Sequence, residues 1–77
     1  MRFSRITVRP DVFGGKPCIR GLRFPVATLL ALLASGLTPN EILAAYPYLE
    51  AADIPEALRY GARLVSDEPV EFGDATD

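Results

Sequence analysis

The sequence predicts a mostly helical fold with a small N-terminal β-hairpin followed by three packed helices. Two patterns support this prediction. Apolar and polar residues alternate near the N-terminus, and from residue 25 onward apolar residues recur at helical spacing. Short turns separate the three helical segments, which is compatible with a helix-turn-helix. We therefore divide the 77 residues into a strand-and-turn segment (1–24), a three-helix unit (25–65) and an acidic tail (66–77).

The N-terminal segment is expected to contain two extended stretches. Residues 5–9 alternate between polar and apolar side chains, and the Gly-Gly pair at 14–15 provides a tight turn in which positive φ is expected. The second stretch covers 16–24 and is interrupted by Gly21. A two-stranded hairpin is barely stable alone in water. These strands must therefore pack on the helices or pair with strands of a second copy.

The first helix is predicted over residues 25–35, with Pro25 at its first position, where the missing N–H is not needed. Gly36 follows at the place where a left-handed residue commonly ends a helix. An apolar stripe at helical spacing is predicted to face the core. Its members are Val26, Leu29, Leu30, Leu33 and Leu37.

The second helix has the clearest signature in the chain. Residues 38–41 read Thr-Pro-Asn-Glu, a capping box with proline at the first helical position. In this motif the Thr38 hydroxyl accepts from the backbone of Glu41, and the Glu41 carboxylate accepts in return. The helix is expected over 39–45, since Pro47 disfavours helical geometry in the residue before it.

The third helix is predicted over 53–65, and two residues are candidates for its N-cap. Glu50 is one; we favour Asp53, which places Glu56 at N3 in a second capping box and keeps Pro55 close to the helix start. We expect one side of this helix to be buried and the charged residues to lie on the other. The predicted buried side is Ile54, Leu58, Gly61 and Val65, and the charged side is Glu56, Arg59 and Arg63.

Composition excludes several classes of chemistry. The chain has one cysteine and no histidine, so an internal disulfide, a zinc site of Cys and His, and Ser-His-Asp or Cys-His catalysis are excluded. No carboxylate cluster in the ordered part suggests a metal-assisted nuclease. We therefore expect no enzyme activity, no cofactor, no bound metal and no small-molecule substrate.

Charge and hydropathy give expectations about location and partners. The net charge of −2 conceals a basic head, +5 over residues 1–24, and an acidic remainder, −7 over 25–77. A basic head suits phosphate, which an acidic tail would repel. No apolar run approaches the ~20 residues that cross a membrane, and the start lacks the apolar region of a signal peptide. We expect a cytoplasmic protein that has no membrane partner.

Residues 14–26 read Gly-Gly-Lys-Pro-Cys-Ile-Arg-Gly-Leu-Arg-Phe-Pro-Val, which resembles the signature of the domain-of-unknown-function 433 family. The resemblance continues through 38–43, 46–49 and 57–60 and covers about residues 6–65. It implies a homeodomain-like helix-turn-helix with a small sheet that is often completed in a dimer. It also implies an antitoxin of a type II toxin–antitoxin pair, whose usual partner is a toxin with a PIN-like nuclease domain.

Seven residues are candidates for contact with nucleic acid, and for each of them a purely structural role is the alternative. The arginines before the first helix would bind DNA phosphates or acids of a toxin, or would pair with Glu41 or Asp53 of their own domain. Those on the third helix would enter the major groove or form a solvated face. The polar residues at the start of the second helix are equally explained by capping. The seven are Lys16, Arg20, Arg23, Thr38, Asn40, Arg59 and Arg63.

The acidic tail is a candidate for binding a toxin. We expect it to be disordered until a partner orders it, and its acids would then mimic RNA phosphate in the basic groove of a ribonuclease. The alternative is a solubilising end. The candidate contacts are Asp67, Glu68, Val70, Glu71 and Phe72.

Three functions are compatible with these features. The first is a homodimeric antitoxin that inhibits a PIN-like ribonuclease and, in complex with it, binds its own operator DNA. The second is a stand-alone helix-turn-helix DNA-binding regulator without a toxin. The third is a plain interaction module with no nucleic-acid partner, with which the acidic pI near 5.0 is compatible.

Overall fold

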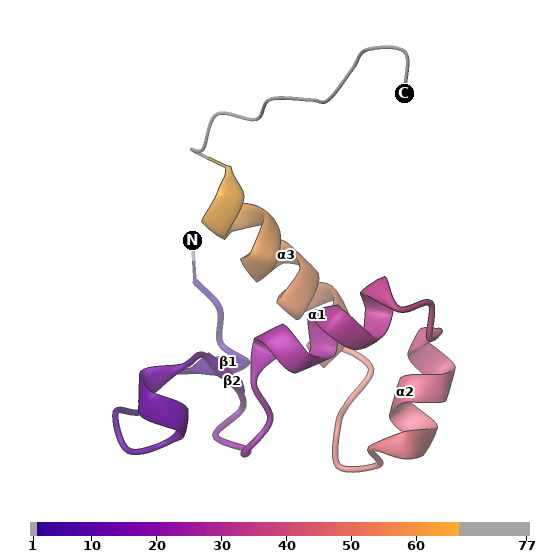
Figure 1. Cartoon of the computed structure of the whole chain (residues 1–77), viewed down its shortest axis with the longest axis horizontal. Coiled ribbons are helices and arrows are strands. Elements are labelled where there is room, and N and C mark those ends of the chain that lie inside the picture. Colours follow the sequence, from indigo (N-terminus) through magenta and orange to yellow (C-terminus); the bar gives the residue numbers. More distant parts are fainter. Residues whose placement is uncertain (1, 67–77) are drawn as a thin grey trace.

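The computed structural model describes residues 2–66 and contains three helices and a two-stranded antiparallel sheet (Figure 1). This confirms the predicted mostly helical fold with its small N-terminal hairpin. None of the helices in this part of the chain is long and apolar enough to cross a membrane. In chain order the elements are β1 (Ile6–Thr7), a 3-10 turn η1 (Phe13–Gly15), β2 (Cys18–Ile19), α1 (Val26–Ala34), α2 (Pro39–Ala45) and α3 (Asp53–Val65).

The two strands pair with each other inside one chain. Ile6 lies opposite Ile19 in the antiparallel ladder. The connection between the strands contains η1, in which Gly14 and Gly15 have φ values of 64° and 89°. Both values lie in the left-handed region that glycine adopts without steric cost, so the predicted turn is confirmed.

The second strand is shorter than predicted because the chain reverses direction immediately after it. Arg20 and Gly21 both have positive φ, at 44° and 73°. Across this reversal the Leu22 N–H donates to the Ile19 carbonyl at 2.7 Å, and the Ile19 N–H donates to the Phe24 carbonyl at 2.9 Å. A left-handed φ is unfavourable for a residue with a Cβ, so the side chain of Arg20 needs a partner that holds it.

Helix α1 buries the stripe that its spacing predicts. Val26 and Leu29 are fully buried, and the rest of the stripe is half-buried against the core. Its start differs by one residue from the prediction. Pro25 has an extended ψ of 143° and is the N-cap, so that Val26 is the first helical residue.

Both predicted caps between α1 and α2 are confirmed. Gly36 has a φ of 102°, and its N–H donates to the Leu33 carbonyl at 3.1 Å, which ends α1. The Thr38 hydroxyl accepts from the Glu41 N–H at 3.2 Å, and a Glu41 carboxylate oxygen accepts from the Thr38 N–H at 2.8 Å. The bounds of α2, Pro39–Ala45, are those predicted.

Helix α3 has the predicted bounds, but its predicted N-cap is wrong. Ala52 is the N-cap and Asp53 is the first helical residue. The Asp53 carboxylate accepts instead from the Glu50 N–H at 2.7 Å, three residues back along the chain. Glu56 also takes no part in a capping box, because its carboxylate binds the backbone of the N-terminal segment.

The predicted buried side of α3 is correct for Ile54 and partly for Gly61, which is half-buried, but wrong for Leu58 and Val65. These last two side chains are exposed, whereas the expected surface residue Glu56 is buried. The helix is rotated because its first turn directs carboxylates, not apolar groups, at the strands. Its second half then extends beyond the body of the protein (Figure 1).

The core is a single apolar cluster to which every helix contributes, and α3 lies close against α1 at Gly61. A Cβ at this position would lie 3.1 Å from a δ-carbon of Leu30. The buried members of the cluster are Ile19, Phe24, Val26, Leu29, Ile42, Leu49, Ile54 and Ala57.

Candidate functional site

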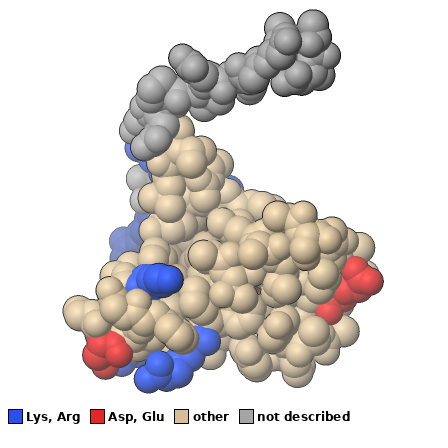
Figure 2. All heavy atoms as spheres, in the orientation of Figure 1, with Lys and Arg blue, Asp and Glu red and all other residues tan. Residues whose placement is uncertain are grey.

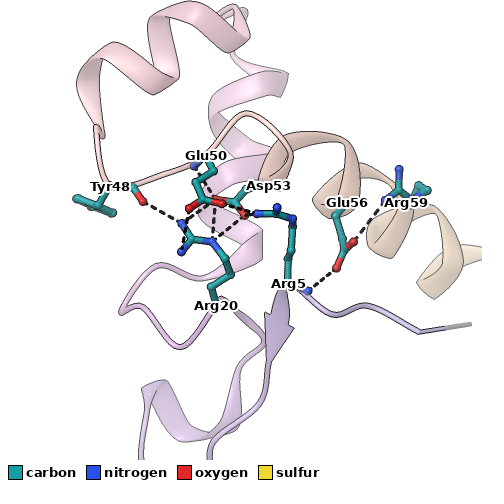
Figure 3. A network of polar contacts seen from close by, with 7 residues as sticks. All are labelled: Arg5, Arg20, Tyr48, Glu50, Asp53, Glu56 and Arg59. Atoms are coloured by element: carbon teal, nitrogen blue, oxygen red, sulfur yellow. Dashed lines mark hydrogen bonds and ion pairs between the residues drawn. The ribbon is translucent and has the colours of Figure 1, made fainter.

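The most strongly bonded polar group in the structure is the carboxylate of Asp53 (Figure 3). Its side chain is 0% exposed. One oxygen accepts from Arg20 Nε at 3.0 Å and from Arg5 Nη1 at 3.0 Å, and the other accepts from Arg20 Nη2 at 3.1 Å. Arg20 follows β2 and Arg5 precedes β1, so one carboxylate binds both strands to the start of α3.

Further contacts extend this arrangement. Arg5 Nη1 also donates to Glu50 at 2.7 Å, and Arg20 Nη2 donates to the Tyr48 carbonyl at 2.9 Å. The Arg5 N–H donates to the Glu56 carboxylate at 2.6 Å. We call these side chains the Asp53 cluster: Arg5, Arg20, Glu50, Asp53 and Glu56. The cluster fixes the N-terminal sheet and the segment 46–52 on the first turn of α3.

The electrostatics of the cluster favour its charged form. Burial alone would raise the pKa of Asp53, but hydrogen bonds from Arg20, from the Glu50 backbone and from Arg5 hold it below its ordinary value. Hydrogen bonds to Glu50 and Asp53 raise the pKa of the Arg5 guanidinium. Within residues 2–66 every buried side-chain nitrogen or oxygen has a hydrogen-bond partner. The cluster therefore stabilises the packing of the N-terminal sheet against α3.

Several of the predicted nucleic-acid contacts already have partners in the chain. Arg20 binds Asp53, one of the two acids that the sequence offered, and Thr38 caps α2 with Glu41. The Arg23 guanidinium lies 5.7 Å from the centre of the Phe13 ring. The remaining four candidates are exposed: Lys16, Asn40, Arg59 and Arg63.

The two arginines of α3 line the same open hollow. Arg59 and Arg63 are one helical turn apart, and with Ala62 and Ser66 they border a hollow of about 290 Å³. Glu56 lies 3.4 Å from Arg59, which is half-exposed, and partly neutralises it. Arg63 has no ion-pair partner among the residues that the structure describes. The outer face of α3 thus offers one free and one partly satisfied guanidinium.

Apolar side chains on the same half of α3 are also uncovered. Leu58 is 50% exposed, and Leu64 and Val65 are about 60% exposed. Single exposed apolar residues are ordinary, but several on one short segment are typical of a binding surface. We call this segment, residues 58–65, the free half of α3.

An apolar groove lies between the free half of α3 and the start of α1. Its volume is about 180 Å³, and its walls are residues 16–17, residues 25–27 with Leu30, and Tyr60 with Leu64. Lys16 is the one charged side chain lining it in the described structure. We call this feature the α1–α3 groove.

Charge is unevenly distributed over the surface. In Figure 2 the face formed by α1, α2 and α3 is largely free of charged side chains, whereas basic groups gather at the end formed by the N-terminal segment. Within residues 2–66 no group of three or more His, Cys, Asp or Glu side chains is placed to hold a metal ion.

The sequence did not reveal two of the features described above. Arg5 was read as part of a strand, and nothing local indicated that its partner was 48 residues away. The groove was missed because Leu64 was assigned no role and the opposite face of α3 was taken as buried. The tail candidates Asp67, Glu68, Val70, Glu71 and Phe72 lie outside the described residues.

Comparison with known proteins gives three matches. Residues 6–61 match the model of a family described as "Protein of unknown function (DUF433)". The uncharacterized protein y4eO of Sinorhizobium fredii is 40% identical over 70 residues, covering 90% of this chain but only 32% of the relative. The crystal structure of a DUF433 member protein from Anabaena variabilis is 40% identical with a TM-score of 0.74, covering 78% of this chain and 59% of that one. This chain thus spans about a third of the curated relative's length.

Proposed function

We propose, from the premise that this chain belongs to the DUF433 family of proteins of unknown function, that it is an antitoxin-like protein. In this proposal it docks on a PIN-like ribonuclease toxin and inhibits it. The toxin class comes from the resemblance of the sequence to a family commonly inferred to contain antitoxins. The docking role is supported by the chain itself.

The single observation that supports docking is the free half of α3. It leaves Leu58, Leu64 and Val65 exposed to solvent, and Arg63 is exposed on the same two turns of the helix. Exposed apolar side chains and arginine on one short segment are a composition that protein interfaces favour. A nucleic-acid surface is lined with phosphates, so three apolar side chains would gain little there. This surface therefore favours a protein partner over DNA alone.

Charge complementarity supports a two-part attachment. Arg63 on α3 would pair with acids of the toxin, and the acids of the tail, from Asp67 to Glu71, would meet the basic groove in which a ribonuclease binds RNA. In this arrangement the tail occupies the place of the RNA phosphates. Inhibition would follow from exclusion of substrate.

The test is reconstitution with the product of the adjacent gene, which the proposal requires to be a PIN-like nuclease. The two proteins are co-expressed and purified, and cleavage of a labelled RNA is measured with and without this chain. We expect a stable complex and loss of cleavage. The double variant Leu58→Glu, Val65→Glu should weaken binding at least tenfold, whereas Ala44→Glu, an exposed change on α2, should not. A nuclease that neither binds the wild-type chain nor is inhibited by it would refute the proposal.

Operator binding is a second candidate, which the hollow lined by Arg59 and Arg63 favours. A homodimer would place two such helices at the half-sites of a two-fold operator. Each phosphate contact that is lost should reduce the slope of log affinity against log salt by about 0.9. Binding of the toxin complex to its promoter DNA is therefore compared for wild type and the variants Arg59→Ala and Arg63→Ala. An unchanged slope would exclude this face as the DNA contact.

A further inference from the structure

The α1–α3 groove is apolar, open and next to the point where the described chain ends. Leu64 forms part of its wall, and Ser66 is the last described residue. Eleven residues follow, of which Val70 and Phe72 are the bulky apolar members and five are acidic. We propose that this segment, 67–77, folds back on its own chain and inserts Phe72 into the α1–α3 groove.

The size and lining of the groove suit an aromatic ring. Its volume of about 180 Å³ exceeds the ~150 Å³ of an apolar protein cavity that accepts benzene. Apolar atoms from Pro17, Val26 and Leu30 line it, so water inside it gains few hydrogen bonds. A phenyl ring replaces that water and removes its own surface from solvent as well.

The chain is long enough to make this contact. The helical rise places Ser66 about 9 Å beyond Tyr60, which lies in the groove wall. Phe72 is six residues beyond Ser66, and an extended chain of that length spans up to about 20 Å. Pro69 disfavours continuation of α3. The segment can therefore turn at the end of the helix and return along it.

Charge favours this occupant over an apolar segment of another protein. Lys16 lines the groove, is exposed, and has no ion-pair partner within residues 2–66. Glu71 directly precedes Phe72 in the sequence. When the ring enters the groove, the neighbouring carboxylate is brought close to the Lys16 ammonium, and no acidic residue of the groove wall opposes it.

The consequence goes beyond the proposed antitoxin function and does not require it. In the free protein the segment 67–77 covers part of the free half of α3, including Leu64. A partner that binds either the segment or the groove must first separate them. The contact would thus tune affinity for any partner and protect the apolar surface while none is present.

The test uses the full chain and a single reporter. The chain contains no tryptophan, so Phe72→Trp introduces one fluorophore at the inserted position. We expect blue-shifted emission and quenching by acrylamide at least threefold weaker than for a free tryptophan peptide. The protection should not change with protein concentration, because the contact is within one chain.

A matched pair of variants identifies the groove. Ala27→Glu, made in the Phe72→Trp chain, adds a carboxylate to the wall at an exposed position of the first turn of α1, where acids suit the helix. Thr28→Glu adds the same charge in the same turn, outside the wall. We expect Ala27→Glu to restore solvent-like emission and quenching and Thr28→Glu to leave both protected. Circular dichroism confirms that both variants are folded.

Three results would each overturn the proposal. They are solvent-like emission of Phe72→Trp alone, protection that survives Ala27→Glu in a folded chain, and protection that grows with protein concentration, which would indicate a second copy as the source of the segment. Because no toxin or DNA is present in this experiment, its failure leaves the proposed function intact.

Discussion

The two halves of α3 differ in how the protein uses them. The first half is buried: Asp53 and Glu56 bind the N-terminal segment, and Ile54 and Ala57 enter the core. In the second half Tyr60 and Gly61 pack against the rest of the protein, whereas apolar and basic side chains are exposed. One helix therefore serves as the anchor of the fold at its start and as a presented surface at its end.

This difference shows how a small chain separates stability from binding. A short domain buries only about 60% of its surface on folding, so most of its residues cannot be spared from the core. Here the contacts that hold α3 in the fold are concentrated in its first two turns, where charged groups are paired and buried. The remaining turns are left to recognise a partner, and changes in them should leave the fold intact.

The largest loss of stability is expected when the Asp53 carboxylate in the first half of α3 is removed. Asp53→Asn should lower the free energy of unfolding by about 3 kcal/mol, because the two arginines lose their shared buried acceptor. Urea denaturation followed by circular dichroism measures it. Glu50→Gln is the control: its side chain is 56% exposed, and the expected loss is below about 1 kcal/mol. Equal effects of the two substitutions would contradict the central role of Asp53.

Acidic pH should also lower the free energy of unfolding, by less than Asp53→Asn does. Because the folded-state pKa of Asp53 lies below its ordinary value of 3.8, the stability it contributes is fully present above that value. It is lost as the pH falls through that value toward the folded-state pKa. Unfolding in urea at a series of pH values from 7 to 2 should show this loss for wild type and a shallower decline for Asp53→Asn. Parallel profiles for the two proteins would refute it.

Two substitutions at Arg20 distinguish the contribution of its hydrogen bonds to Asp53 from that of its backbone strain. Arg20→Ala removes the contact with Asp53 but keeps a Cβ at a φ of 44°. Arg20→Gly removes the same contact and relieves the strain, which costs roughly 1 kcal/mol for a non-glycine residue. We expect the glycine variant to be the more stable of the two by about 1 kcal/mol in urea denaturation. The opposite order would show that this reversal is unstrained.

The smallest loss of stability is expected from substitutions in the free half of α3. Leu58→Ser and Val65→Ser, in the free half of α3, should each change the unfolding free energy by no more than about 0.5 kcal/mol, since both side chains are exposed. Ile54→Ala, on the buried half of the same helix, should cost about 3 kcal/mol. Thermal unfolding of the three variants gives the comparison. A large loss from Leu58→Ser would mean that this half is also part of the core.

Local signals in the sequence were sufficient for α1 and α2. The stripe of α1 and the capping box formed by Thr38 and Glu41 depend on residues within one or two turns, and the structure has both. The first turn of α3 depends on Arg5 and Arg20 instead, which lie 48 and 33 residues away from Asp53. No periodicity within α3 contains that information, and the face of the helix was therefore predicted wrongly.

The candidate site was predictable to a similar extent. The exposure of Arg59 and Arg63 follows from their charge and spacing. For Arg20 the sequence analysis offered Glu41 and Asp53 as partners. The folded chain selects Asp53, because the Glu41 carboxylate is used in the cap of α2. The groove could not be predicted, because its walls come from three segments that meet only after folding.

Gly61 has a consequence for how this surface can vary among relatives. Its missing side chain lets α3 lie against Leu30, a residue of the groove wall, while Gly61 itself is not part of that wall. One added methyl group would have to displace Leu30. A substitution at residue 61 would therefore alter the shape of the groove from a position that does not itself line it.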